Sequence, residues 1–248
     1  METALQRIQQ RINGILDLTG LNLSELPPLP DDLIELRCGH NQLTFLPRLP
    51  SSLRHFHCHN NELTSLPDLP SLETLSCSYN SLPSLPSLPA SLTMLVCMRN
   101  DLTTLPALPP SLHTLAIDFN YITRLPELPP SLTHLSCSWN ELTLFPSLPH
   151  SLQHLYCFNN PLEALPELHS TLLHLVCILP YSNERFATDL TPELIQQVNR
   201  ENQKWIETQS KERSIKRCMT YYEELMCMRW HPDRVDHLYD MGYLLADM

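Results

Sequence analysis

Leucine recurs along most of the chain with a period of 20 residues, in the phrase S-L-x-x-L-x-C-x-x-N-x-L-T-x-L-P-x-L-P-x. The first leucines of successive copies are Leu33, Leu53, Leu72, Leu92, Leu112, Leu132, Leu152 and Leu172, and only the step from Leu53 to Leu72 is one residue shorter. An atypical first copy, with Leu21 in place of asparagine, begins at Leu16. A fixed period of this length predicts a solenoid, in which each repeat packs only against its neighbours.

Each copy divides into three segments that predict different local structures. The L-x-x-L-x-C segment alternates apolar and polar residues, which predicts a short strand that pairs in parallel with the next copy. The asparagine that follows is expected to satisfy backbone groups at the turn, in a ladder of Asn41, Asn61, Asn80, Asn100, Asn120, Asn140 and Asn160. The L-T-x-L-P-x-L-P segment favours an extended return of polyproline-II type, because proline lacks an N–H and disfavours helix at the preceding residue.

Most of the nine cysteines occupy one position of the repeat, which other copies fill with Leu18 and Ile117. These cysteines are Cys38, Cys58, Cys77, Cys97, Cys137, Cys157 and Cys177. A position shared with leucine and isoleucine is predicted to be buried, and one thiol per layer pointing the same way is poor disulfide geometry. We therefore expect reduced thiols and a cytoplasmic, reducing compartment.

The segments outside the repeats predict helical caps, so the chain is expected to have three parts. Residues 1–14 form an N-terminal cap, in which a short helix over residues 3–11 turns Leu5, Ile8 and Ile12 to one face. Residues 15–180 hold about nine copies of the repeat. Residues 181–248 form a C-terminal helical cap and tail, of which residues 181–189 are a connector.

A helix is predicted to begin at Thr191-Pro192, since threonine is a good N-cap and proline suits the first turn. Its apolar residues, Leu194, Val198, Trp205 and Ile206, are expected to dock on the last repeat. A second helical pattern runs from Ile215 to Met226 and stops at Pro232.

The charge of the chain argues against one class of partner, nucleic acid. The formal net charge is −11, and no stretch is basic enough for a phosphate-binding face, which argues against nucleic acid. The N-terminal residues lack a signal-peptide core, and no apolar run approaches the length of a membrane span. We therefore expect a monomer that binds neither nucleic acid nor membrane and needs no cofactor.

The repeats resemble the leucine-rich repeats of type III effectors, which Gram-negative pathogens inject into host cells, and share their x-L-P-x-L-P-x-S-L-x-x-L signature over about residues 12–178. This resemblance implies a right-handed solenoid with a parallel concave β-sheet and an extended convex side. The tail from Tyr221 to Arg234 has the form Y-x-E-E-L-M-x-x-x-W-H-P-x-R and resembles the tails of giant DNA virus (mimivirus-like) proteins. That second resemblance implies a viral origin but no biochemical role.

The variable positions of the strand segment carry the functional prediction, because the constant positions build the fold. They include aromatic residues, methionine and arginine, which are typical of protein-binding surfaces. We predict a non-enzymatic module that binds a protein on its concave face, and the resemblance to effector and viral proteins implies that this protein belongs to a host cell. The predicted binding residues are His55, His57, Tyr79, Met94, Arg99, Phe119, His134, Trp139, His154, Tyr156 and Phe158.

Three alternatives use other residues. His55, His57 and His59 share one strand face and could bind zinc or copper, but their spacing of about 6.6 Å and the inward cysteines favour a polar or pH-sensitive patch. Effectors with such repeats often carry a ubiquitin-ligase domain whose catalytic cysteine is followed by an acid, which Cys218 and Cys227 lack, so at most a degenerate ligase is expected. Finally, the chain could be an adaptor whose C-terminal tail recruits another factor through Trp230 to Arg234. This stretch contains His231-Pro232-Asp233, which matches the chaperone-contacting signature of J-domains.

Overall fold

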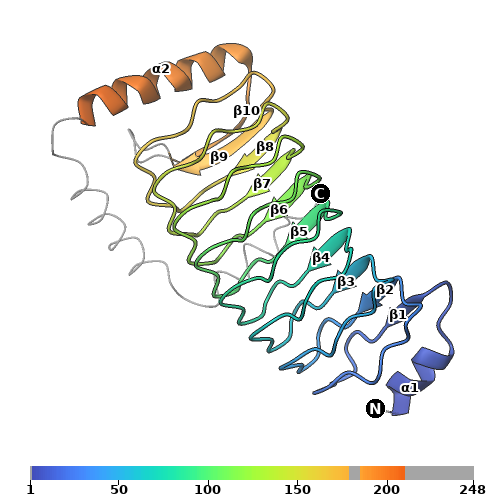
Figure 1. Ribbon diagram of the computed structural model, residues 1–248. Helices are drawn as coiled ribbons and strands as arrows, with labels where there is room; N and C mark the ends of the chain where they lie inside the picture. Colours follow the sequence, from blue (N-terminus) through green and yellow to red (C-terminus); the bar gives the residue numbers. More distant parts are fainter. Residues whose placement is uncertain (1, 179–184, 210–248) are drawn as a thin grey trace. The chain divides into compact units, whose positions relative to one another are not determined.

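The computed structural model describes residues 2–178 and 185–209. Met1–Trp205 form one compact unit and Ile206–Met248 a second. In the first unit, short strands lie side by side between two helices (Figure 1). The elements are α1 (Glu2–Gln9), β1 (Ile15–Asp17), β2 (Glu35–Arg37), β3 (His55–His57), β4 (Thr74–Ser76), β5 (Met94–Val96), β6 (Thr114–Ala116), β7 (His134–Ser136), β8 (His154–Tyr156), β9 (His174–Ile178), β10 (Arg185–Asp189) and α2 (Pro192–Gln209).

The strands form one ten-stranded sheet whose order follows the sequence. Strands β1 to β9 pair in parallel, and their central residues lie in register, as Leu95 does with Leu115. The prolines of the return segments remove backbone donors, and between the strands of successive repeats these segments form neither helix nor strand. The predicted solenoid is therefore confirmed.

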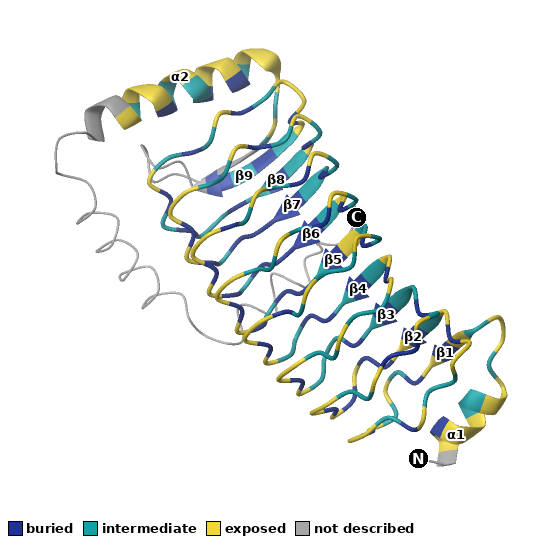
Figure 2. Cartoon of the chain, viewed as in Figure 1, coloured by how far each residue is buried: buried dark blue, intermediate teal, exposed yellow. Residues whose placement is uncertain are grey.

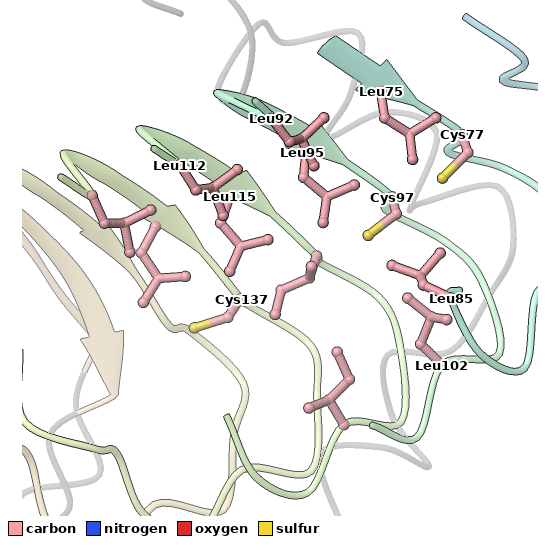
Figure 3. Packing of buried hydrophobic residues seen from close by; sticks show 14 of the residues in the cluster. Leu75, Cys77, Leu85, Leu92, Leu95, Cys97, Leu102, Leu112, Leu115 and Cys137 are labelled. Carbon is pink, nitrogen blue, oxygen red and sulfur yellow. The ribbon is translucent and has the colours of Figure 1, made fainter. Parts of the chain in front are cut away.

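The core is a continuous apolar cluster that runs through every layer (Figure 2). In each layer the strand and the return segment turn their leucines toward one another, as Leu92, Leu95 and Leu102 do in Figure 3. All three are fully buried, and burial of a leucine side chain stabilises a fold by about 2 kcal/mol. Each copy of the repeat therefore adds one layer of buried leucines to the core, and this burial stabilises the solenoid.

The ladder cysteines line this core as free, buried thiols (Figure 3). Desolvation raises the pKa of Cys38 to about 12. Hydrogen bonds between thiols of adjacent layers, Cys77 with Cys97 and Cys157 with Cys177, accompany raised pKa values in Cys97 and Cys157. Because the thiolate is the reactive form, these cysteines are chemically inert while the solenoid is folded.

The ladder asparagines bind backbone groups where the strands end. The amide nitrogen of Asn140 donates to the carbonyl oxygens of Ile117, Cys137 and Ser138 at 2.9, 3.1 and 3.3 Å. Its Oδ1 accepts a bond of 3.0 Å from the backbone N–H of Ile122. Asn140 thus joins its own layer to the preceding one, and it is buried.

A second ladder, of serines, lies at the opposite turn, before each strand. Ser131 Oγ donates to the carbonyl oxygens of Pro110 and Leu112 in the preceding layer, at 2.6 and 2.7 Å. Equivalent bonds are made by Ser52, Ser91, Ser111 and Ser151. The serine of the repeated phrase therefore has a structural role that its position in the sequence did not reveal.

The residue before each ladder asparagine has a left-handed backbone. Its φ angle is between 52° and 56° in seven successive copies, at His40, Asn60, Tyr79, Arg99, Phe119, Trp139 and Asn159. Side chains other than those of glycine and asparagine are uncommon in this region, and one there costs about 1–2 kcal/mol. The tight turn from strand to return segment imposes this conformation on whichever residue the copy supplies.

The N-terminal cap differs from the expected one. Helix α1 ends at Gln9, so Ile12 lies beyond it and is 74% exposed, and Leu5 is 46% exposed. The expected common face of Leu5, Ile8 and Ile12 is therefore wrong. Instead Ala4 is fully buried and Ile8 packs beside the core, because the small alanine lets the helix approach the first layer closely.

The C-terminal end corrects the expectation of a connector over residues 181–189. Residues Arg185–Asp189 form β10, which pairs antiparallel with β9 and extends the sheet by one strand. Helix α2 then begins as predicted, with Thr191 Oγ1 accepting a bond of 3.3 Å from the N–H of Leu194. Val198 and the unexpected Ile195 are buried in the core cluster, whereas Ile206 is exposed.

Side-chain amides of α2 bind the return segment of the last complete layer. Asn199 accepts from the N–H of Leu168 at 3.0 Å and donates to its carbonyl oxygen at 2.9 Å. Asn202 does the same with Leu165, at 3.1 and 2.8 Å, and Trp205 Nε1 donates to the carbonyl of Glu163. One helix face, at spacings of three residues, therefore supplies the hydrogen bonds that a further layer would have supplied.

Candidate functional site

The face of the sheet opposite the core, which we call the concave face, carries the predicted binding residues. On each strand the first and third residues point to this face, and the two residues that follow the buried cysteine position continue it. The parallel register aligns equivalent residues of successive strands into columns that run across the sheet. Most of the predicted residues fall into two such columns and a polar N-terminal part.

The first column holds Tyr79, Arg99, Phe119 and Trp139, and we call it the ring file together with Phe158, which lies one position earlier in the next layer. The guanidinium carbon of Arg99 lies 5.1 Å from the ring centre of Tyr79 and 4.7 Å from that of Phe119. Phe119 and Trp139 stack at 5.3 Å with 10° between their planes, and Phe158 meets Trp139 edge-on at 6.3 Å. The left-handed turn aims Tyr79, Arg99, Phe119 and Trp139, so a cation is held between aromatic rings along one margin of the face.

The second column, the histidine file, consists of His134, His154 and His174 at the first positions of β7, β8 and β9. The rings of His134 and His154 stack at 4.4 Å with 10° between their planes, and His154 and His174 are 6.4 Å apart. His174 Nδ1 lies 2.9 Å from a carboxylate oxygen of Asp189 on β10, and its ring lies 5.4 Å from that of Tyr156. Desolvation and the neighbouring His154 lower the pKa of His134, so it is uncharged at neutral pH.

Small side chains fill the space between the two files. Ala116 is fully buried, and Ser136 and Ser138 are nearly so. Met94, at the edge of β5, is 37% exposed, whereas Met98 is buried. At β6 and β7 the large side chains therefore lie at the two margins of the concave face, whereas Tyr156 occupies the central position on β8.

Asp118 is the one carboxylate at this centre, and it is fully buried. Its Oδ1 accepts bonds of 2.8 Å from the Ser136 hydroxyl and from the backbone N–H of Ser138, whereas no described group bonds to Oδ2. Burial raises the pKa of Asp118 to about 6, and the bonds from Ser136 and Ser138 oppose that rise. Asp118 is thus a buried acid with half of its carboxylate unsatisfied.

The N-terminal part of the concave face is polar. Arg37 donates to Glu35 at 2.6 Å, and His57 Nε2 lies 3.7 Å from the same carboxylate oxygen. His59 meets His40 edge-on at 5.1 Å. Desolvation lowers the pKa values of both His57 and His59. His57 and His59 are therefore uncharged at neutral pH, beside the ion pair of Arg37 with Glu35.

The three histidines considered as metal ligands have separate neighbours. His55 Nδ1 lies 3.3 Å from the Thr74 hydroxyl, while His57 and His59 have the neighbours just given. Within residues 2–178 and 185–209, no group of three or more histidine, cysteine, aspartate or glutamate side chains is arranged to hold a metal ion. The arrangement favours the polar patch over the metal site.

Three residues of this face were not among the predicted binding residues, although alternation along the strands puts two of them, His174 and Asp118, on it. The structure adds His174 and Asp189 to the histidine file and places Asp118 at the centre of the face. His174 has the same repeat position as His134 and His154, so the column itself was the signal for it. Alternation puts Asp118 on this face, but the sequence does not indicate its burial, which depends on the neighbouring layers.

The other candidates from the sequence lie outside the described residues. These are Cys218, Cys227, the His231-Pro232-Asp233 tripeptide, the second helical pattern and the virus-like tail from Tyr221 to Arg234. Neither helix of the described part has both the length and the apolar composition needed to cross a membrane.

Comparisons with known proteins agree with the geometry. The family model "Leucine Rich repeats (2 copies)" matches residues 51–90. YopM from Yersinia enterocolitica is 42% identical over 61% of this chain, with a TM-score of 0.60. YopM from Yersinia pestis, a leucine-rich effector protein, is 37% identical over 69% of this chain, with a TM-score of 0.62.

A third solved structure is a Shigella effector leucine-rich-repeat domain, which is 34% identical over 65% of this chain, with a TM-score of 0.59. The match covers 77% of that domain, but only 34% and 57% of the two YopM chains. The search of curated proteins gives no match. The stacked parallel strands, the repeated leucines and the extensive match to the Shigella domain together show that this chain belongs to the leucine-rich-repeat family.

Proposed function

We propose that the chain is a non-enzymatic protein-binding module whose concave face holds a segment of a partner protein. The observation that carries the proposal is the ring file, in which four aromatic side chains and one arginine lie in contact over five successive layers. Tyrosine, tryptophan and arginine are the residue types in which interface binding energy is concentrated.

The backbone of the ring file supports a role beyond folding. The left-handed turn favours glycine or asparagine, and the same column has Asn60 in the layer before Tyr79 and Asn159 in the layer after Trp139. The intervening copies instead have tyrosine, arginine, phenylalanine and tryptophan, at a cost of about 1–2 kcal/mol each in backbone strain. Since the fold itself would be more stable with asparagine, function is the better explanation of the large side chains.

The likeness to effector domains supports the same class of function. Leucine-rich-repeat solenoids are generally non-catalytic scaffolds that bind proteins. As part of the proposal, the partner is a protein of a host cell, and the module acts as a monomer in a reducing compartment, which suits its buried free thiols. The tail that resembles viral proteins is consistent with such a host-directed role but is not needed for it.

The experiment is a selection of binders from a displayed library of random peptides and small domains against the full-length protein. Each binder is then tested on a Phe119→Asn/Trp139→Asn variant, in which both substitutions place asparagine where the same column has it naturally. The control is Tyr121→Asn/Leu144→Asn, which removes two exposed apolar side chains from the return segments. Circular dichroism checks that both variants are folded.

We expect the first variant to bind selected ligands at least about ten-fold more weakly, because it removes two aromatic contacts of the interface. The control variant should bind as tightly as the unmodified protein. Binders that are unaffected by the first variant, or a selection that yields no binders, would show that the concave face is not the binding surface.

A further inference from the structure

We propose that two copies of this chain pair through their β10 strands, so that the two sheets join into one. Pairing goes beyond the proposed function, in which the module acts as a monomer: that monomer is the form at low concentration, and the pair forms at high concentration. Three features favour a second copy at this place: the open edge of β10, the direction of its backbone groups, and the order of its charges.

The two ends of the sheet differ in how the described residues close them. At the first end the chain folds back against β1, where the N–H of Ile15 donates to the carbonyl oxygen of Ile12 at 3.1 Å. At the other end β10 is the last strand, and β9 is its one neighbour among the described strands. An edge strand presents backbone groups that can pair with another chain. Within residues 2–178 and 185–209, the open edge is therefore that of β10.

The hydrogen bonds around β9 determine which backbone groups of β10 face outward. The N–H of Leu190 donates to the carbonyl oxygen of Leu173 at 2.7 Å, whereas the N–H of His174 donates to Gln153, in the preceding layer, at 3.0 Å. Because backbone groups alternate along an antiparallel strand, every second residue of β10, starting from the partner of His174, turns its N–H and C=O away from β9. These residues are Arg185, Ala187 and Asp189. The Asp189 carbonyl accepts one bond of 3.1 Å from Thr188 Oγ1 and has a second lone pair for another.

The charges of β10 are complementary to those of a second β10 in one antiparallel register. When Ala187 of each copy lies opposite Ala187 of the other, Arg185 lies opposite Asp189 at both ends of the strand pair. All outward residues then form hydrogen-bonded pairs, with about six main-chain bonds. The Asp189 carboxylate bonds to His174 but is 97% exposed, so it remains accessible to a second cation. Opposite charges across a strand pair stabilise it, whereas a parallel pair in register would oppose like charges.

The pair is expected to be transient and to place both concave faces together. Stable interfaces bury about 1,200–2,000 Å², more than two five-residue strands provide, so we expect a dissociation constant of about 10–100 μM. Residues opposite each other in antiparallel strands point to the same side of the sheet. The two concave faces therefore lie on one side of the joined sheet, where a partner with two binding segments could contact both.

The experiment is sedimentation velocity of the full-length protein at pH 7.5 with a reducing agent, from about 1 to about 200 μM, a range that spans the expected dissociation constant. The variants Arg185→Asp and Asp189→Arg each give both charged positions of β10 the same sign. His174→Gln is the control for loss of the contact between His174 and Asp189. Ala187→Pro removes an outward N–H that β9 does not use. Circular dichroism checks that each variant is folded.

We expect each charge variant alone to pair at least about ten-fold more weakly than the unmodified protein. An equimolar mixture of the two charge variants should pair again, because every aspartate then lies opposite an arginine. Ala187→Pro should weaken pairing, and His174→Gln should leave it unchanged. A full-length protein that stays monomeric at about 200 μM overturns the inference, as do charge variants that pair no better mixed than alone. Neither result affects the proposed function, which is tested separately with Phe119→Asn/Trp139→Asn.

Discussion

The buried carboxylate of Asp118 should make the solenoid less stable at neutral pH than it would be with an amide at this position. Asp118→Asn keeps an oxygen that can accept from the Ser136 hydroxyl and the Ser138 N–H, and it removes the negative charge. The amide is close in shape to the protonated acid. The substitution therefore isolates the free energy of ionising a fully buried group.

The shift of the Asp118 pKa sets the size of the gain in the free energy of unfolding that Asp118→Asn should produce. The pKa is about 6 in the folded chain against 3.8 for the unperturbed group, because desolvation outweighs the hydrogen bonds from Ser136 and Ser138. The folded state therefore holds this proton more tightly than the unfolded state, so stability falls as pH rises from about 4 to about 6. The difference of about 2.2 units corresponds to about 3 kcal/mol at pH 7 and above. Asp118→Asn should gain this amount at neutral pH, about half of it near pH 5, and well under 1 kcal/mol near pH 4.

Urea unfolding followed by circular dichroism, repeated at several pH values, measures this gain. The control is Asp101→Asn, at an exposed position, which should change the free energy of unfolding by less than about 0.5 kcal/mol. Ser136→Ala removes one bond to Oδ1 and should enlarge the gain from Asp118→Asn, since the carboxylate is then less stabilised. A gain that is absent at neutral pH, or that does not depend on pH, would refute the argument that burial controls this group.

Three further predictions test the fold. Asn140→Ala should lower the free energy of unfolding by about 3 kcal/mol or more in urea, because it leaves the Ile122 N–H and several buried carbonyls unsatisfied; a loss below about 1 kcal/mol would contradict this role. Trp139→Gly should be more stable than Trp139→Ala by about 1 kcal/mol, the reverse of the usual order, because φ is 56° there; thermal unfolding of the pair decides it. The ladder thiols should resist iodoacetamide in the folded protein at pH 8 and react in urea, as peptide mass spectrometry can measure; rapid labelling of Cys97 without urea would show that this thiol is not buried.

The fold could be predicted from the sequence because every copy of the repeat has the same pattern of apolar and polar residues and so forms the same local structure. The leucine spacing predicted the strand and the return segment, and a position shared by cysteine, leucine and isoleucine predicted burial. The ends were harder to predict, because no repeat constrains them. Ile12 was placed on the N-terminal helix by its spacing, but the helix ends before it and Ala4 makes the close contact instead.

The candidate site likewise has features that the repeat predicts and features that it does not. The sequence placed Trp139 and His154 on the concave face, since alternation along a strand and a fixed period determine which residues share a face. It could not show that Arg99 lies between two rings or that the histidines stack, because ring orientation depends on backbone angles and on neighbours in adjacent layers. It also missed β10, whose pairing with β9 joins segments through contacts that no repeat specifies.

The sequence by itself determined the period, the buried columns and the residues available to the concave face, because these follow from local alternation repeated at a constant interval. Only the tertiary structure decided the left-handed turn that aims most of the ring file, the burial that shifts the pKa of Asp118, and the docking of Asn199 and Asn202 on the last layer. Each of these depends on groups brought together from different layers or from the end of the chain. Their energies come from desolvation and from hydrogen bonds between those groups, which no single repeat contains.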